Sequence, residues 1–260
     1  DEISLQHQSN IIQFENIKGV VHAHSKNSDG NATMEQMANE CIRLGYEYLC
    51  MSDHSQSAFY ASGLSPERVM MQWREIDELN AKLSPFKIFK GIESDILYNG
   101  ELDYDDELLS GFDFVIASLH SQFKISESKA TERIITAIQN PYTTILGHPT
   151  GRLLLSREGY PVDMHAVIEA CSKHNVVIEL NAHPWRLDID WRLIERATNA
   201  GVKISINPDA HNFTGIGDIR FGTYAAQKGG LKISQTFNAM TREEVESYFI
   251  NRKKLIGQSA

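Results

Sequence analysis

Cysteine is scarce in this sequence, and the three that occur, Cys41, Cys50 and Cys171, are spaced too irregularly for a disulfide framework or a CxxC zinc site. So few thiols are typical of a reducing compartment, and we expect a cytoplasmic location. Apolar runs are also short and end well before the ~18 residues that a membrane span needs. The first residues carry neither a basic nor an apolar segment, so we expect no signal peptide and no membrane partner.

Positive charge is in short supply as well: the 260 residues contain 25 Lys and Arg against 34 Asp and Glu, a formal charge of -9. A protein that coats nucleic acid needs a basic face, so this balance argues against that class, although it does not exclude a local basic groove. The hydrophobic fraction of 42% is enough for one sizeable core.

Linkers rich in Gly, Ser or Pro are missing, which indicates one compact domain. We expect a polar lead-in at 1–16, this domain at 17–252 and a C-terminal tail at 253–260. The first methionine is Met34, so we also expect the chain to be a piece of a longer protein, with another domain before the lead-in.

The domain alternates short β-type segments with amphipathic helical segments. Thr33 and Gln36 form a capping box, and Ser65 and Asp163 are expected to cap two further helices. Such alternation predicts a parallel sheet with right-handed crossovers. The count of strands and the chain length favour a closed or nearly closed α/β barrel over an open sheet. The expected strands are 20–24, 48–52, 87–93, 112–119, 143–147, 176–180 and 203–206.

Histidines and acids gather where these strands end. In a barrel of parallel strands the carboxyl ends share one rim, and active sites are built there. One histidine in such a place is weak evidence, but His7, His165, His174 and His183 are the only four of the ten histidines that lie elsewhere. The clustered residues are His22, His24, Asp29, His54, Glu93, His120, His148, Asp209 and His211.

Imidazole nitrogens mixed with carboxylates, without thiolates, are the ligands of hydrolytic zinc, manganese or iron sites. Nine candidate ligands are too many for one ion, so we expect two or three divalent ions (Mn²⁺, Zn²⁺ or Fe²⁺). Glu93 is suited to bridging a pair of them. Two close metals can hold a hydroxide for attack on phosphorus, which predicts phosphoester hydrolysis.

These motifs together resemble the PHP (polymerase and histidinol phosphatase) family over 17–252. The resemblance implies a distorted seven-stranded (β/α) TIM-like barrel with a trinuclear metal site. It places His22, His24, Glu93 and Asp209 on the first metal, and Asp29, His54 and His211 on the second. The third metal would share Glu93 and add His120 and His148. The motifs are His22-Ala23-His24-Ser25, Ser28-Asp29-Gly30, Ser52-Asp53-His54, Gly91-Ile92-Glu93, Ser118-Leu119-His120, Gly147-His148-Pro149 and Asp209-Ala210-His211.

Within this family the sequence is most similar to the C-terminal PHP domain of bacterial family X DNA polymerases. The supporting segments are 14–19, 150–154 and 179–189. This likeness implies a manganese-favouring 3′–5′ exonuclease or 3′-end phosphatase that trims DNA ends in repair. It also implies a polymerase domain as the N-terminal partner.

We expect Glu93, Asp209 and His211 to take part in catalysis, and Arg152 and Arg186 to contact the substrate phosphate. The two arginines could equally pair with nearby acids. Asp53 either orients a ligand such as His54 or caps a strand end.

Phe59 and Tyr60, in the loop that follows His54, could stack on a base, or they could form a packing lid.

Three other functions stay open. A small-molecule phosphatase, such as one for histidinol phosphate, would need a closed pocket. A non-catalytic brace for a polymerase has no need of a full ligand set. A metal-dependent amidohydrolase often bridges its metals with a lysine, and no lysine ends a central strand here.

Overall fold

The computed structural model describes residues 10–259. The first nine residues of the expected lead-in therefore lie outside the described part. Ile12 is fully buried, and its amide donates to the carbonyl of Leu231 at 2.9 Å. The described end of the lead-in thus packs on the barrel.

Seven parallel strands of the described chain form one sheet in sequential order, as predicted. Consecutive strands pair in parallel register from the first to the last. The expected bounds agree within about two residues at each end. The strands are β1 (Gly19–Ala23), β2 (Tyr48–Met51), β3 (Lys87–Asp95), β4 (Phe114–Ser118), β5 (Thr143–Leu146), β6 (Val177–Asn181) and β7 (Ile204–Asn207).

The first and last strands meet, so the barrel is nearly closed. At the carboxyl end, Ala23 bridges Ala210, and the amide of His24 donates to the Ala210 carbonyl at 2.8 Å. Between the two strands, the side chain of Asn238 donates to the Gly19 carbonyl of β1 at 3.4 Å and to the Ile206 carbonyl of β7 at 2.6 Å, and it accepts from the Ile206 amide at 3.0 Å. Backbone and side-chain hydrogen bonds thus replace a regular ladder, and the barrel is distorted at this seam.

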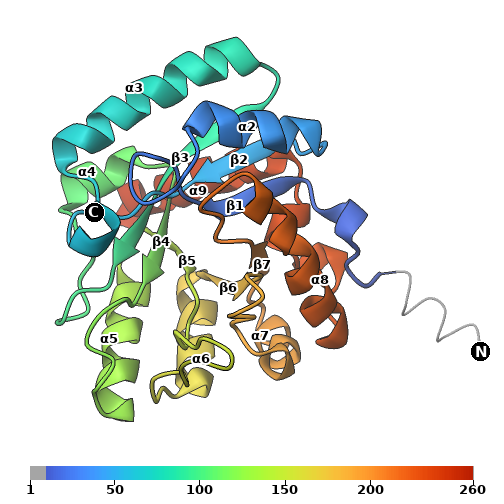
Figure 1. Cartoon of the computed structure of the whole chain (residues 1–260). Coiled ribbons are helices and arrows are strands. Elements are labelled where there is room, and N and C mark those ends of the chain that lie inside the picture. The colour runs from blue at the N-terminus through green and yellow to red at the C-terminus, as the bar shows by residue number, and fades with distance from the viewer. Residues whose placement is uncertain (1–9, 260) are drawn as a thin grey trace, which may run out of the picture.

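Helices cover the outside of the barrel (Figure 1). The expected caps at Thr33, Ser65 and Asp163 are confirmed, each accepting a hydrogen bond from a first-turn amide. The outer helices are α2 (Met34–Arg43), α3 (Pro66–Leu83), α4 (Asp106–Gly111), α5 (Glu127–Gln139), α6 (Met164–His174), α7 (Ile194–Asn199) and α8 (Ile219–Lys228).

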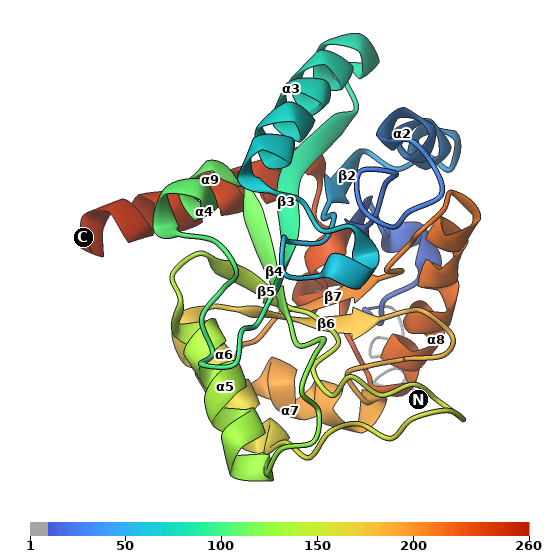
Figure 2. The same cartoon turned by 60° about the vertical axis from the view of Figure 1, so that its left-hand side comes forward.

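Helix α9 (Arg242–Ser259) closes the amino end of the barrel. Its buried Phe249 stacks on Phe114 at 5.4 Å between ring centroids and meets Phe89 edge-on at 5.3 Å. Because strand side chains alternate between faces, these rings fill the barrel interior while their neighbours pack against the outer helices. Figure 2 shows α9 on one side of the sheet and the loops after β5 and β6 on the opposite side. The opposite, carboxyl end is therefore the open one.

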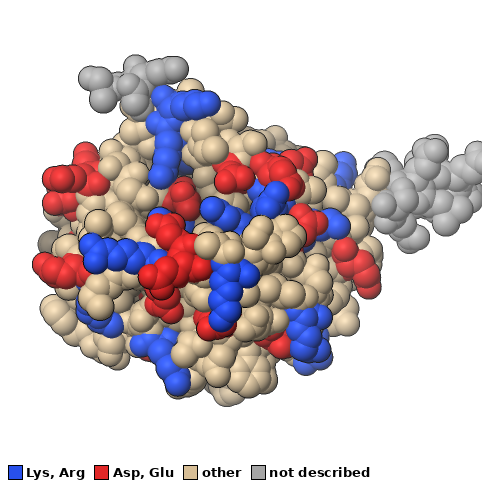
Figure 3. Space-filling model, turned by 90° about the horizontal axis from the view of Figure 1, so that it is seen from above, with Lys and Arg blue, Asp and Glu red and all other residues tan. Residues whose placement is uncertain are grey.

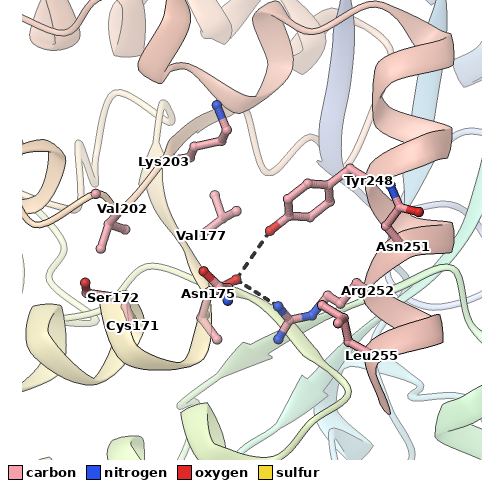
Figure 4. Close-up of a pocket in the computed structure, with 12 residues that line it drawn as sticks. Cys171, Ser172, Asn175, Val177, Val202, Lys203, Tyr248, Asn251, Arg252 and Leu255 are labelled. Carbon is pink, nitrogen blue, oxygen red and sulfur yellow. Dashed lines mark hydrogen bonds between the residues drawn. The ribbon is translucent and has the colours of Figure 1, made fainter. Parts of the chain in front are cut away.

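A small pocket of about 260 Å³ separates α9 from the end of α6. The hydroxyl of Tyr248 and the guanidinium of Arg252 both donate to the carbonyl of Asn175, which ends α6 (Figure 4). These bonds hold α9 against the outer layer.

Charges of both signs are mixed on the face that carries α2 and α3 (Figure 3). Lys82 pairs with Glu35 at 2.5 Å, and Lys90 pairs with Asp77 at 2.7 Å. This face therefore offers no continuous basic track to a nucleic acid. Among the described residues, no helix is long and apolar enough to cross a membrane.

Candidate metal centre

The polar ends of the strands meet in one cluster at the carboxyl end of the barrel. Glu93, near the end of β3, lies among side chains that come from β1 and from the loops after β1, β2, β4, β5 and β7. All nine ligands expected from the sequence are brought together in overlapping groups. These are His24, Asp29, His54 and His211; His22, His24 and Asp209; His22, Glu93 and His148; and His54, Glu93 and His120.

The backbone leaves regular strand geometry where two of these side chains enter the cluster. His22 has a φ of 65° beside a register shift in β1, and Asp209 has a φ of 52° just after Pro208. A non-glycine residue rarely adopts a left-handed conformation, and such strain concentrates at functional sites. The irregularity turns His22 and His24 toward the same centre, with their ring centroids 5.2 Å apart.

Each oxygen of Glu93 faces its own set of imidazoles. Oε1 lies 2.9 Å from Nε2 of His148 and 3.2 Å from Nε2 of His120. Oε2 lies 3.1 Å from Nδ1 of His54 and 3.6 Å from Nε2 of His24. A carboxylate with partners on both oxygens has the arrangement needed to bridge two ions.

Asp29 and Asp209 complete the cluster on either side of Glu93. Asp29 lies 3.6 Å from Nε2 of His54 and 3.4 Å from Nε2 of His211. Asp209 lies 3.2 Å from Nε2 of His24. Neighbouring ligands of a four-coordinate ion with bonds of ~2.0–2.1 Å stand ~3.3 Å apart, so these separations fit shared divalent ions.

Several buried nitrogens in the cluster also have no hydrogen-bond partner among the described residues. They are Nε2 of His22, both ring nitrogens of His24 and Nδ1 of His54. A buried polar atom left without a partner costs free energy, so native proteins satisfy nearly all of them. A metal ion is the partner that nitrogens and carboxylate oxygens at these distances share. The residues therefore fit a multinuclear metal centre.

Electrostatics act unevenly on these groups. Burial would lower the pKa of His120 and of His211, but nearby carboxylates raise these pKa values to about 10 and about 9, so a metal ion must displace a proton from each ring. Burial lowers the pKa of His24, and it lowers that of His54 to about 4 despite the charge of Glu93. Burial would raise the pKa of Glu93, but the charges of His120, His22 and His54 outweigh it and hold that pKa well below its usual value. Neutral imidazoles beside ionised carboxylates are the forms that bind metal.

Two carboxylates that the sequence analysis did not single out fix the orientation of cluster histidines. Glu179, in the middle of β6, accepts from Nδ1 of His22 at 2.6 Å, and Asp95, at the end of β3, accepts from Nδ1 of His120 at 2.6 Å. Such partners set the tautomer and raise the basicity of a metal-binding histidine. The signal was available, because Glu179 is an acidic residue within the one strand that supplies no expected ligand.

Asp53 forms hydrogen bonds with the loop after β1 and does not orient His54. Its carboxylate accepts from the amide and hydroxyl of Ser25, both at 2.7 Å, and from the hydroxyl of Ser28 at 2.6 Å. This loop folds tightly on itself, since a Cβ on Gly30 would lie only 2.4 Å from the His24 carbonyl oxygen. The buried Asp53 therefore positions the loop that carries the ligand candidate Asp29.

Comparison with known proteins agrees with this geometry. The family model described as "PHP domain" matches residues 21–183, which is more than half of the chain. The chain belongs to the PHP domain family. It is a metal-dependent hydrolase that acts on phosphoester bonds.

Relatives of this PHP domain fall into two groups. It is 43% identical, over 92% of its length, to "DNA polymerase/3'-5' exonuclease PolX" of Bacillus subtilis, and it spans 42% of that protein. It is 28% identical, over 91% of its length and 96% of the relative's, to a Thermoanaerobacter protein named "Probable phosphatase". A solved histidinol phosphate phosphatase from Lactococcus lactis shares the fold, with a TM-score of 0.60 at 19% identity, covering 82% of this chain and 94% of that one.

The two arginines expected to contact substrate differ in their surroundings. Nε of Arg186 lies 3.7 Å from the carboxylate of Asp209, which belongs to the metal centre. Arg152 pairs with Asp190 at 2.8 Å, and it also donates to the backbone carbonyls of Arg186 and Leu187. Arg186 is therefore available at the cluster, whereas the donors of Arg152 are used to hold the loop after β6.

Proposed function

We propose that this PHP domain trims the 3′ ends of DNA as a 3′–5′ exonuclease or 3′-end phosphatase, within a bacterial family X DNA polymerase that acts in repair. The observation that carries the proposal is the 43% identity to the Bacillus subtilis PolX protein, which extends over 92% of the chain. Because the chain spans only about two fifths of that relative, the polymerase partner is part of the proposal.

The proposed ligands are the nine clustered side chains, holding two or three ions of Mn²⁺, Zn²⁺ or Fe²⁺. When bound, these ions would supply Lewis-acid stabilisation and a nucleophile at neutral pH. Glu93 and Asp209 bring negative charge to the buried centre, while Glu179 and Asp95 fix the rings of His22 and His120.

Substrate reaches the centre from one side. The side chains of His22 and His24 are fully buried, whereas Asp29 is 30% exposed and His211 is 36% exposed. A phosphate therefore approaches over Asp29 and His211. Arg186, beside Asp209, is placed to bind a phosphoryl oxygen by charge-assisted hydrogen bonds.

A second candidate is a phosphatase for a small phosphomonoester. The solved Lactococcus lactis relative is complexed with Zn, L-histidinol and phosphate, and the Thermoanaerobacter relative matches over nearly its whole length. This candidate shares the chemistry and differs only in what surrounds the phosphate. A non-catalytic brace is disfavoured, because it would not need buried imidazole nitrogens without protein partners.

The experiment compares two kinds of substrate. Metal-loaded protein is incubated with an end-labelled single-stranded oligonucleotide, with the same oligonucleotide carrying a 3′-phosphate, and with glycerol phosphate. We expect Mn²⁺-dependent trimming of the oligonucleotide with a kcat/KM well above that for glycerol phosphate, and no turnover by Glu93→Gln. A preference for the small ester would replace the proposal with the second candidate.

A further inference from the structure

Two of the exposed aromatic residues lie in loops, after different strands, that also carry groups in contact with the metal centre. Phe59 lies on the short 3-10 helix η2 (Phe59–Ala61) after β2 and is 88% exposed. Trp185 lies in the loop after β6 and is 57% exposed. A large ring left in solvent near a catalytic site is available to stack on a ligand.

Each ring is next in sequence to a side chain that reaches the centre. Tyr60, after Phe59, meets the rings of His54 and His120 edge-on at 6.1 and 6.4 Å. Arg186, after Trp185, approaches Asp209 at 3.7 Å. Adjacent Cα atoms are ~3.8 Å apart, so the backbone that carries each exposed ring lies directly beside a residue that contacts the centre.

Both rings are also mounted on fixed backbone. Ala58 and Ala61, on either side of Phe59, are buried, and the amide of Ser57 donates to Asp103 at 2.6 Å. The carbonyl of Trp185 accepts from the Leu154 amide at 2.6 Å, and the Trp185 amide donates to His183 at 3.3 Å. A packing lid would bury its ring, whereas the ring of Phe59 is exposed.

We infer that Phe59 and Trp185 are stacking platforms for the bases on either side of the reacting phosphate, which makes a single-stranded polynucleotide end the preferred substrate class. This inference rests on the proposed function and deepens it. Successive bases stack on aromatic side chains in proteins that bind single strands, while cationic groups follow the backbone. Arg186, next to Trp185 in sequence, supplies such charge beside Asp209.

The positions of Phe59 and Trp185 on separate loops favour a nucleic acid over a protein or a small phosphate ester as the ligand. A protein partner would be met by a contiguous apolar patch, whereas these rings stand on separate loops around a catalytic centre. A small phosphate ester has at most one ring to stack, and two platforms would then serve no purpose.

The test uses Phe59→Ala and Trp185→Ala, with Tyr224→Ala as the matched control, because Tyr224 is an exposed aromatic on the outer helix α8. Steady-state kinetics are measured with Mn²⁺ on a single-stranded oligonucleotide, on the same oligonucleotide with its last two nucleotides abasic, and on glycerol phosphate. Anisotropy of a labelled phosphorothioate oligonucleotide reports binding without turnover.

We expect each platform variant to raise KM and Kd for the oligonucleotide about fivefold or more, with kcat nearly unchanged. On the abasic oligonucleotide and on glycerol phosphate the same variants should match wild type, and Phe59→Tyr and Trp185→Phe should retain affinity. Unchanged KM and Kd, or equal losses on all three substrates, would overturn the inference. If the wild-type protein trims no oligonucleotide but the platform variants still bind it more weakly than wild type does, only the proposed function would be refuted.

Discussion

At the scale of single residues, the chemistry depends on carboxylates that hold imidazoles in place. Glu179 is fully buried and binds three partners besides His22: the amide of His148 at 2.9 Å and the side-chain amides of Asn181 and Asn207 at 3.0 and 2.7 Å. Every one of these groups donates to it. The site thus requires an acceptor on both oxygens, which only an ionised carboxylate provides.

Glu179→Gln is expected to weaken metal binding about 10–100-fold while the protein stays folded. The side-chain NH₂ of the introduced glutamine would face hydrogen-bond donors. His22 would also lose the partner that fixes its tautomer. Titration of metal-free protein with Mn²⁺ or Zn²⁺, read by calorimetry, measures the change. Affinity equal to that of wild type would show that Glu179 serves packing alone.

The two rim arginines are expected to respond differently to truncation. Arg186→Ala should lower kcat/KM about 10–100-fold, because a charge-assisted bond to phosphate is lost while stability is retained. Arg152→Ala should instead lower the free energy of unfolding by about 1–3 kcal/mol, because Asp190 and backbone carbonyls lose their partner. Kinetics and urea unfolding on both variants separate these roles. Identical behaviour of the pair would contradict the assignment.

At the scale of secondary-structure elements, most of the architecture could be predicted from the sequence. Five of the seven described strands end in small or polar residues, and three helices of the outer layer are capped by the side chains of Thr33, Ser65 and Asp163. These are local signals. Helix α9 has no clear apolar period, so its role in closing the barrel depends on contacts of Phe249 with distant strands.

Phe249→Ala is expected to destabilise the protein by about 3–5 kcal/mol, because the ring packs among Phe89 and Phe114 inside the barrel. The matched control is Ile250→Ala, at an adjacent and 47% exposed position, where we expect a change within about 0.5 kcal/mol. Urea unfolding followed by circular dichroism measures both. Equal effects would show that α9 does not plug the barrel.

The site could be predicted from the sequence only in part, for a physical reason. Ligand candidates follow from strand ends, since parallel strands bring these ends together. The partners of Arg152 and the hydrogen bonds of Asp53 depend on how separate loops fold over the rim, and no spacing records that. The role of Glu179 was overlooked because it depends on a hydrogen bond to His22, 157 residues away in the sequence, which no local pattern records.

At the scale of the whole molecule, the metal centre joins elements from both ends of the chain. The formal charge of -9 includes Asp29, Glu93 and Asp209 in this centre, and three divalent ions would bring it to -3. Because Lys and Arg are mixed with Asp and Glu on the α2–α3 face, tight DNA binding is not expected there (Figure 3). Affinity for a substrate must therefore come from residues at the carboxyl end of the barrel, around the metal centre.

Removing the metals is expected to lower Tm by about 8–16 °C. Ions present at ~1,000 times their Kd stabilise the native state by about 4 kcal/mol, and each kcal/mol shifts Tm by about 2–4 °C at this size. Without ions, Glu93 and Asp209 lose their partners inside the barrel. Differential scanning calorimetry with and without a chelator makes the comparison. A Tm that differs by less than 1 °C would argue that the cluster holds no ion.

The proposal of a multinuclear metal centre that hydrolyses phosphoesters at DNA ends can be decided by one titration. Mn²⁺ is added stepwise to metal-free protein, and trimming of a 3′-end-labelled single-stranded oligonucleotide is followed in wild type and in Glu93→Gln. We predict that the wild-type rate rises until two or three equivalents are bound and that the Glu93→Gln rate stays at background. Saturated wild type without activity, or equal rates for the two proteins, would contradict the account.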